Sequence, residues 1–149
     1  MLSSSSLSKK KILVRSILPY FYANTMATAF DLQRLTDTVD MTLDEMQHHP
    51  ELLINAFDKD HHVIFWNDIS AKFFGISPEE ALGKKLADLL PYTRNDERMV
   101  WLERGLQGQE IQILNGRYKQ HRGSYEQRII PIRDENGVVC GVANVVKNL

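Results

Sequence analysis

Cysteine, net charge and long apolar runs are what this sequence has least of. Its 149 residues include one cysteine, Cys140, which excludes an internal disulfide framework and any cysteine-rich zinc or iron–sulfur site. The 18 basic and 19 acidic side chains nearly cancel, so no charge excess is available to drive nucleic-acid binding. No apolar run approaches the roughly 18 to 20 residues of a membrane-spanning helix. We therefore expect one globular, cytoplasmic domain with no direct contact to nucleic acid or membrane.

The first 27 residues differ from the rest in charge. Every charged side chain before Asp31 is basic, and the order of basic, apolar and small residues over positions 3–29 loosely copies a secretory signal. Arg15 and Pro19 interrupt the apolar part of this order. We therefore expect residues 1–27 to be a disordered or variable leader, or translation to start at Met26.

An amphipathic helix is predicted over residues 28–49, and Pro50 ends it. Its apolar side chains recur at steps of three and four, at Leu32, Leu35, Val39, Leu43 and Met46. Two interpretations stay open. Either this stripe pairs with a second copy of the chain, or it covers an apolar face of its own sheet.

Residues 50–149 carry alternating strand and helix signals and form the main predicted domain. Strands are predicted near 52–57, 62–66, 109–118, 123–133 and 138–147, and helices near 69–74, 77–82, 85–90 and 95–107. The direct links between strands read as hairpins, so the sheet should be antiparallel with helices packed on one face. This is an α+β fold.

Two motifs in this domain resemble those of a known family. The first comprises FDKD at 57–60, VIFWN at 63–67 and AKFFGISPEEALGK at 71–84, and the second is PIRDENGVVCGV at 131–142. The first is similar, position by position, to the N-terminal signature of the PAS domain, the five-stranded sensory fold of bacterial and eukaryotic signalling proteins. The second resembles the closing hairpin of that domain. The resemblance implies a PAS-like five-stranded antiparallel sheet that binds haem, a flavin, a metabolite or nothing.

Departures from the family pattern bear on the cofactor. His61 stands where the family often has glycine, so its turn is of another type or holds a left-handed histidine. Haem-binding members of the family use a histidine on the long helix, and residues 95–107 contain none. A cysteinyl-flavin adduct needs an Asn-Cys-Arg context, whereas Cys140 is expected to be a small residue of the last strand. The cofactor is thus unknown, with both of these chemistries disfavoured.

Metal binding and catalysis find little support in the residues. The histidines at 48–49 and 61–62 form adjacent pairs, whose side chains point in different directions and do not chelate one ion. Asp58 and Asp60 resemble paired carboxylates, but capping within a polar turn accounts for them. No Gly-x-Ser-x-Gly motif or glycine-rich phosphate loop is present. We expect neither a metal site nor catalytic residues.

Side chains from the sheet and the helices should converge on one interior space, which is either a filled core or a ligand pocket. Asn67 is expected mainly to cap the following helix, with ligand contact as the alternative. The predicted lining consists of Phe65, Asn67, Phe74, Leu90, Met99, Leu102, Ile113 and Ala143.

The second strand predicts a surface for pairing. In the PAS pattern Val63 and Phe65 turn toward the helices, which leaves Ile64 and Trp66 on the outer face. Such a patch needs a cover, and the helix over 28–49 can supply it from the same copy or from a partner. The predicted dimer or partner interface consists of Leu32, Leu35, Val39, Leu43, Met46, Ile64 and Trp66.

A sensory, dimerising module is the leading function. Its expected partners are a second copy of the chain, a separate signalling effector and a small-molecule ligand. Two alternatives remain: a small-molecule enzyme on a PAS-like sheet, which should have converging polar groups, and a purely structural interaction domain, which should have no cavity.

Overall fold

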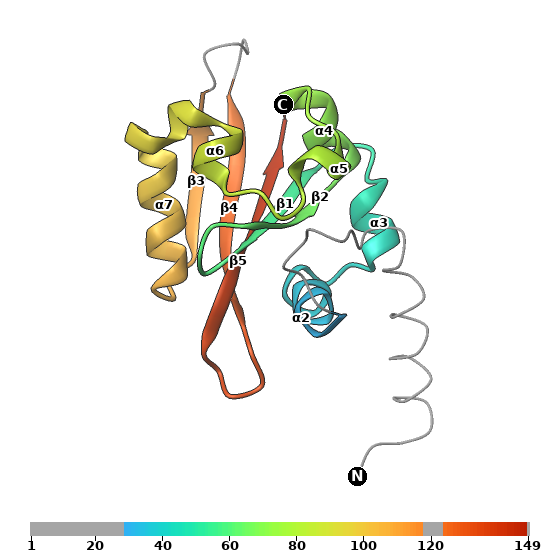
Figure 1. Ribbon diagram of the computed structural model, residues 1–149, viewed down its shortest axis with the longest axis vertical. Helices are drawn as coiled ribbons and strands as arrows, with labels where there is room; N and C mark the ends of the chain where they lie inside the picture. The colour runs from blue at the N-terminus through green and yellow to red at the C-terminus, as the bar shows by residue number, and fades with distance from the viewer. Residues whose placement is uncertain (1–28, 118–123, 149) are drawn as a thin grey trace.

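An antiparallel sheet forms the centre of this computed structural model, which describes residues 29–117 and 124–148 (Figure 1). Within these residues the sheet has five strands in the order β2-β1-β5-β4-β3. The strands are β1 (Leu53–Asp58), β2 (Val63–Trp66), β3 (Ile111–Gly116), β4 (Tyr125–Arg133) and β5 (Val139–Lys147). All neighbouring strands pair antiparallel, which confirms the predicted α+β fold.

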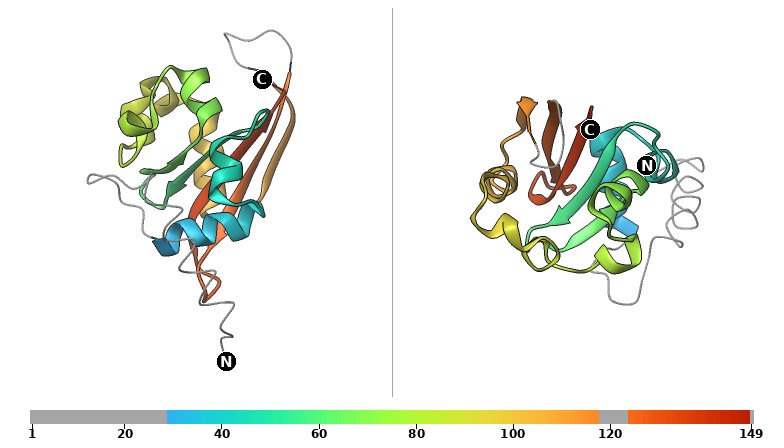
Figure 2. Two further views of the ribbon diagram at one scale, coloured as in Figure 1. Left: turned by 90° about the vertical axis from the view of Figure 1, so that its right-hand side faces the viewer. Right: turned by 90° about the horizontal axis from the view of Figure 1, so that it is seen from above.

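Helices cover both faces of the sheet. On the outer face lie α2 (Ala29–Val39) and α3 (Leu43–Gln47), and Figure 2 shows α2 crossing the strands. The helices of the inner face are α4 (Asp68–Phe74), α5 (Pro78–Ala81), α6 (Leu86–Leu89), the 3-10 helix η2 (Pro91–Asn95) and α7 (Glu97–Leu106). The predicted helices after β2 are all present, and η2 is an addition between two of them.

The prediction of a single helix over 28–49 is wrong in one respect. In the part of this segment that the structure describes, the helix is broken into α2 and α3. Asp40 adopts a left-handed φ of 61°, which ends α2. Thr42 then caps α3, and its side-chain oxygen accepts a hydrogen bond from the Glu45 backbone N–H at 3.1 Å. The capping-box spacing of Thr42 and Glu45 is the sequence signal for this break.

A bulge in β2 decides which of its side chains face the inner helices and which face α2. Ala56 of β1 pairs with Phe65, but the next residue, Phe57, pairs with Val63, so Ile64 is an extra residue on β2. Ile64 and Phe65 therefore both belong to the outer core under α2. Strict alternation resumes with Trp66, which faces inward.

The turn between β1 and β2 contains a histidine in the left-handed conformation, which was one of the two alternatives predicted for His61. His61 has a φ of 71°, a conformation that a single non-glycine residue adopts at modest free-energy cost. Its backbone oxygen accepts a hydrogen bond from Leu86 at 3.0 Å, and Val63 exchanges backbone bonds with Gly83 and Lys84. The segment around 83–86 thus covers the free edge of β2.

No helix in the described ranges has the length and apolar character needed to cross a membrane. The leader, secretory signal and alternative start considered for residues 1–27 lie outside the described residues.

Candidate functional site

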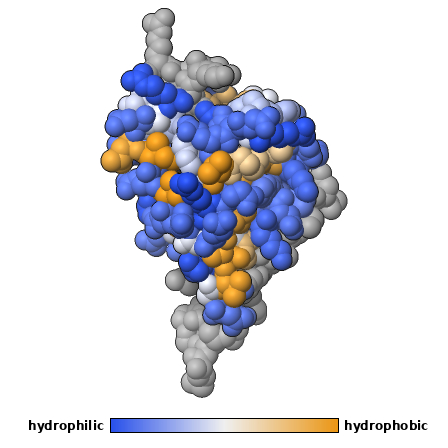
Figure 3. Space-filling model, turned by 90° about the vertical axis from the view of Figure 1, so that its left-hand side faces the viewer, coloured by the Kyte–Doolittle hydropathy of each residue, from blue (hydrophilic) through white to orange (hydrophobic). Residues whose placement is uncertain are grey.

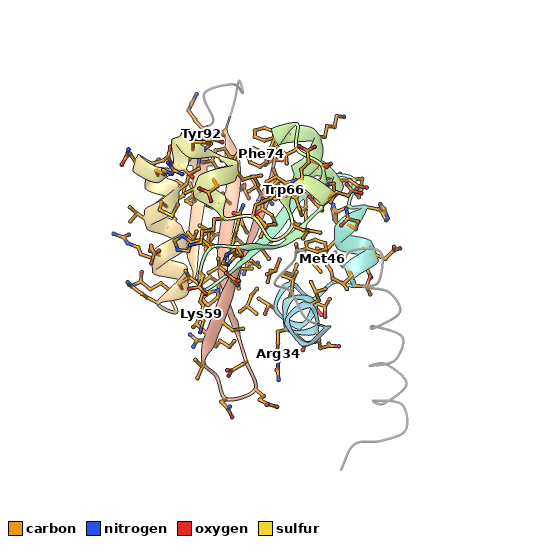
Figure 4. All side chains as sticks on the ribbon, in the orientation of Figure 1. Arg34, Met46, Lys59, Trp66, Phe74 and Tyr92 are labelled. Atoms are coloured by element: carbon orange, nitrogen blue, oxygen red, sulfur yellow. The ribbon has the colours of Figure 1, made fainter. Side chains whose placement is uncertain are left out.

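A cavity of about 60 Å³ lies between the inner face of the sheet and the helical layer. Trp66 and Phe74 meet at its wall with ring centroids 5.4 Å apart, and Figure 4 shows both on this side of the sheet and Met46 on the other. The side chains around the cavity are mainly apolar and come from four strands and most of the inner helices. They are Asn55, Phe57, Trp66, Phe74, Leu86, Leu90, Tyr92, Thr93, Arg98, Leu102, Gln127, Ile129, Val142 and Asn144.

The structure brings some of the predicted lining residues together. Phe74, Leu90 and Leu102 line the cavity. Met99 packs against the same inner core without reaching the lining. Ile113 pairs with Gln127 across β3 and β4, and it too is absent from the lining.

Two predicted lining residues are on the wrong face. Phe65 and Ala143 lie in the outer core, where both pair with Ala56 and pack beneath α2. The bulge at Ile64 moves Phe65 outward, and the register of β5 against β1 places Ala143 in the same cross-strand row. Because a shift of one residue exchanges the two faces of a strand, this error was not visible in the sequence alone.

The predicted interface residues have a different distribution from the one expected. The assignment of Trp66 to the interface is wrong, since its side chain lines the cavity on the inner face. The other six are packed in the outer core against the chain's own sheet, Val39 partly buried and the rest almost fully buried: Leu32, Leu35, Val39, Leu43, Met46 and Ile64.

Sequence reasoning missed three amide side chains on the cavity wall. Gln127 donates from Nε2 to Asn144 Oδ1 at 2.6 Å, and Asn144 donates from Nδ2 to Asn55 Oδ1 at 3.0 Å. Asn55 Nδ2 lies 3.5 Å from Ser70 Oγ, which itself donates to the Ile54 carbonyl oxygen at 3.1 Å. We call Gln127, Asn144, Asn55 and Ser70 the amide relay. Its sequence signal is an asparagine or glutamine within each of three strands, β1, β4 and β5.

Asn67 is a structural hub and does not line the cavity. Its Oδ1 accepts from the backbone N–H of Ser70, which caps α4, and from that of Ile54. Its Nδ2 donates to the carbonyl oxygens of Met46 and Leu52 at 2.9 and 2.8 Å. Asn67 therefore ties the end of α3 to β1 and α4, beside the last member of the amide relay.

Arg98 is the one cationic side chain among the described cavity residues, and a carboxylate neutralises it. Its guanidinium donates to Asp96 Oδ2 at 2.8 Å and lies 5.8 Å from the ring centre of Tyr92. Burial raises the pKa of Tyr92, against the opposing effect of Arg98, so this phenol is neutral at physiological pH. The cavity therefore has no unbalanced charge on its wall.

Comparisons with known proteins identify the family. A family model described as the PAS fold matches residues 47–148. The chain belongs to the PAS fold family. A search of curated proteins found no match. Among solved structures, the PAS domain of the histidine kinase ThkA is 25% identical over 66% of this chain and 99% of that chain, with a TM-score of 0.57.

Two further structures extend the likeness. A sensory box sensor histidine kinase from Vibrio cholerae is 15% identical with a TM-score of 0.57, covering 98% of this chain and 97% of that chain. The complex of ThkA with the response regulator protein TrrA is 20% identical with a TM-score of 0.58, covering 70% of this chain and 30% of that chain. This PAS domain is thus similar in fold to those of sensor histidine kinases.

The cavity of this PAS domain is too small for the larger cofactors of the family. Pockets for drug-sized ligands measure roughly 300 to 1,000 Å³, and haem and flavins are at least that large. At about 60 Å³ the space accommodates neither group without displacement of its walls. The lining residues fit a much smaller molecule.

Carboxylates and histidines cluster away from the cavity. Asp58, Asp60 and His62 offer ligand atoms within 4.8 Å of one another. The Asp58 carboxylate, however, already accepts from the backbone N–H groups of Asp60 and His62 at 2.9 Å each, as in a capped turn. The turn accounts for these residues without a metal ion.

A second histidine joins the N-terminal helices to the PAS core. His48 Nδ1 lies 2.7 Å from Asp68 Oδ2, and Gln47 Nε2 donates to the other oxygen of Asp68 at 2.9 Å. The hydrogen bond with Asp68 raises the pKa of His48, and the charge of Asp44 adds to this effect. Protonation of His48 therefore strengthens the contact between α3 and α4.

Proposed function

We propose that this chain is a sensory PAS module that registers a small molecule in its inner cavity and passes the change to its N-terminal helices. The observation that carries the proposal is the amide relay, which starts at the cavity wall with Gln127 and ends at Ser70 beside Asn67. A filled structural core gains little from a row of buried amides, because each must find partners to offset its lost hydration. A sensor gains a polar contact that responds to an occupant.

The proposed output route runs from the relay to α3. Ser70 and Asn67 share a hydrogen bond at 3.0 Å, and Asn67 holds the Met46 carbonyl oxygen at the end of α3. A change in the position of Asn55 or Ser70 would alter this attachment. Since α2 directly precedes α3 in the chain and lies on the same outer face, the same change would reach the surface offered to a partner.

A sensor fits the cavity better than an enzyme does. An active site is expected to have converging polar groups with a perturbed acid or base among them. None of the described lining residues is an aspartate, glutamate, histidine, cysteine or serine. The polar groups of the wall are amides, one threonine, one tyrosine and the paired Arg98, which suit recognition.

The experiment is native mass spectrometry of the purified full chain, with a matched pair of variants on α7. Leu102 lines the cavity, so Leu102→Trp should fill it and remove any retained molecule. Val100 lies on the exposed side of the same helix, 49% accessible, so Val100→Trp should leave retention unchanged. Hydrogen exchange of α3 should change in Leu102→Trp only.

Two results would contradict the sensory proposal. One is equal retention in both tryptophan variants. The other is unchanged exchange of α3 when Leu102→Trp has demonstrably emptied the cavity.

A homodimer and a separate effector protein, in the cytoplasm, complete the proposal. The apolar residues of α2 and α3 already pack on their own sheet, so pairing through them requires the helices of one copy to replace those of the other. Light scattering of the full chain should report twice the chain mass, and a monomer at high micromolar concentration would overturn the dimer. By analogy with ThkA, which was solved with a response regulator, the effector is expected to be a signalling protein.

A further inference from the structure

The cavity wall contains a buried hydrogen-bond acceptor with no partner among the described residues. This atom is Gln127 Oε1, and the whole residue is only 4% exposed. The Gln127 side chain lies on the inner face, since its Nε2 donates to Asn144, another lining residue. A buried polar atom without a partner is costly, so its presence calls for an explanation.

The amide relay fixes which atom of Gln127 is left over. The Ile54 carbonyl only accepts, so the Ser70 hydroxyl must donate to it and can only accept from Asn55. Asn55 therefore turns its NH₂ toward Ser70 and its oxygen toward Asn144, which must in turn donate. The same logic makes Asn144 present its oxygen to Gln127, one of whose two N–H groups donates to it. The amide oxygen at the free end of the relay, Gln127 Oε1, is therefore an open acceptor.

A second lining residue has the same polarity. The Thr93 hydroxyl donates to the Leu90 carbonyl oxygen at 2.7 Å, which leaves only its lone pairs for another partner. The indole N–H of Trp66 likewise donates to the Ile76 carbonyl oxygen at 3.0 Å and is not available to another partner. Thr93 and Trp66 thus offer no further donor to a molecule in the cavity, whereas Thr93 and Gln127 offer acceptors.

The charge balance of the wall and the size of the cavity limit the class of molecule that it can hold. No described lining residue is acidic and Arg98 is already paired with Asp96, so an occupant with a full charge would have no counter-charge. An engineered apolar cavity of about 150 Å³ holds benzene. The present cavity, at about 60 Å³, suits something smaller.

From these observations we infer that the cavity binds a small neutral molecule with an apolar body and one N–H or O–H group, which donates to Gln127 Oε1. The inference deepens the proposed sensory function and rests on it, because it names the chemical class of the sensed molecule. A ligand of about five non-hydrogen atoms is limited to a dissociation constant no tighter than roughly micromolar, so binding should be weak and fast.

Pyrrole and furan form a matched pair for the test. Both are neutral five-membered rings of similar size, but pyrrole has an N–H donor where furan has an oxygen acceptor. Titration of the full chain, followed by amide chemical shifts of β4, β5 and α7, should show pyrrole binding about tenfold more tightly, since the furan oxygen would leave Gln127 Oε1 without a partner.

Two glutamine variants locate the preference. Gln127→Met keeps the length of the side chain but removes the acceptor. Asn144→Leu and Asn55→Leu are added to it so that no other amide oxygen is freed on the wall, and the two rings should bind to this triple variant within about twofold of each other. Gln112→Met is the control, because Gln112 is exposed on the neighbouring strand and away from the cavity lining. It should keep the tenfold preference. Circular dichroism confirms that each variant is folded.

The outcomes separate this inference from the proposed function. Equal binding of pyrrole and furan to the natural chain overturns the donor class but leaves a ligand-binding cavity. A preference that survives in the triple variant overturns the assignment to Gln127. If neither ring binds and Gln127 Oε1 is hydrogen-bonded only to a water molecule, the inference is overturned. The sensory role is still decided by the retention and hydrogen-exchange measurements with Leu102→Trp.

Discussion

The two faces of this sheet are built from adjacent rows of the same strands, yet they differ in kind. The outer row runs Phe65, Ala56, Ala143 and Ile130 and packs beneath α2 as a closed apolar core. The inner row is one residue away in every strand and runs Trp66, Asn55, Asn144 and Ile129 along the cavity. The comparison shows that one sheet can hold its N-terminal helices with one face and present polar groups to a cavity with the other.

Size differs between the faces as well as polarity. Two alanines in the middle of the outer row, Ala56 and Ala143, let α2 approach the strands closely, and both are fully buried. On the inner face a helix approaches the strands closely at Gly105 of α7. A side chain at Gly105 of α7 would lie 2.8 Å from Ile129 and Val142, so glycine is needed there, while the helices beyond it stand off and leave the cavity.

On the side of the molecule that carries α7 and β3, the exposed apolar surface is divided into small groups. Figure 3 shows the side of the molecule with α7 and β3 as largely hydrophilic, with apolar side chains in separate patches. The large exposed apolar residues include Val100 on α7, Leu114 on β3 and Val138 before β5. Scattered residues of this kind are normal for a protein surface.

The largest expected effect comes from opening the outer core. Leu35→Ala truncates a fully buried side chain and leaves a cavity between α2 and the sheet. It should therefore lower the free energy of unfolding by about 2 to 5 kcal/mol. Leu114→Ala is the control, since Leu114 is 58% exposed, and should change it by less than about 0.5 kcal/mol. Urea denaturation measures both. A small loss in Leu35→Ala would mean that α2 is not held by the outer face.

Breaking the amide relay should have the next largest effect. Asn144→Leu removes the partner of both Asn55 and Gln127 and should destabilise the protein by about 1 to 3 kcal/mol. Adding Asn55→Leu removes one of the stranded amides, so the double variant should be about 1 kcal/mol more stable than the sum of the single changes predicts. A double-mutant cycle by urea denaturation tests this, and strict additivity would show that the two amides are not coupled.

Adding volume to each face sharpens the comparison further. Ala143→Val forces extra methyl groups into the closed outer core and should cost about 1 to 2 kcal/mol. Its neighbour Val142 lines the cavity, so the methyl group added by Val142→Ile has room and should cost less than about 0.5 kcal/mol. Thermal denaturation ranks the two variants. The reverse ranking would indicate that the inner face is as tightly packed as the outer one.

The smallest expected effect is a pH dependence of the contact between the N-terminal helices and α4. Asp68 raises the pKa of His48 above its ordinary value near 6.5, so this stabilisation is complete below about pH 6.5 and is lost as the pH rises through the higher pKa of the folded state. Between pH 6 and 8 the melting temperature should fall more steeply in the natural chain than in His48→Gln.

Asp68→Asn is the matched control for this pH dependence, because it removes the partner and keeps the histidine. It should flatten the profile in the same way as His48→Gln. Parallel profiles for all three proteins would show that His48 contributes nothing to the contact.

Local sequence determined most of the elements of this PAS domain. Ser77, Pro78 and Glu80 predict a capped helix start, and the structure has that capping box in place. The Asp-Glu-Asn-Gly turn predicts the last hairpin, and β4 and β5 pair on either side of it. Such signals act within a few residues of one another, so they can be read without knowing what the segment packs against.

Only the tertiary structure decided which face each side chain occupies and which face bounds the cavity. The bulge at Ile64, the burial of Phe65 and Ala143 under α2 and the inward turn of Trp66 all depend on the register between strands. Asn55, Gln127 and Asn144 lie on three strands separated in sequence, and their relay exists because antiparallel pairing brings them together. Register is set by packing across the whole sheet, and a slip of one residue exchanges its faces, so the sequence of a single strand does not contain this information.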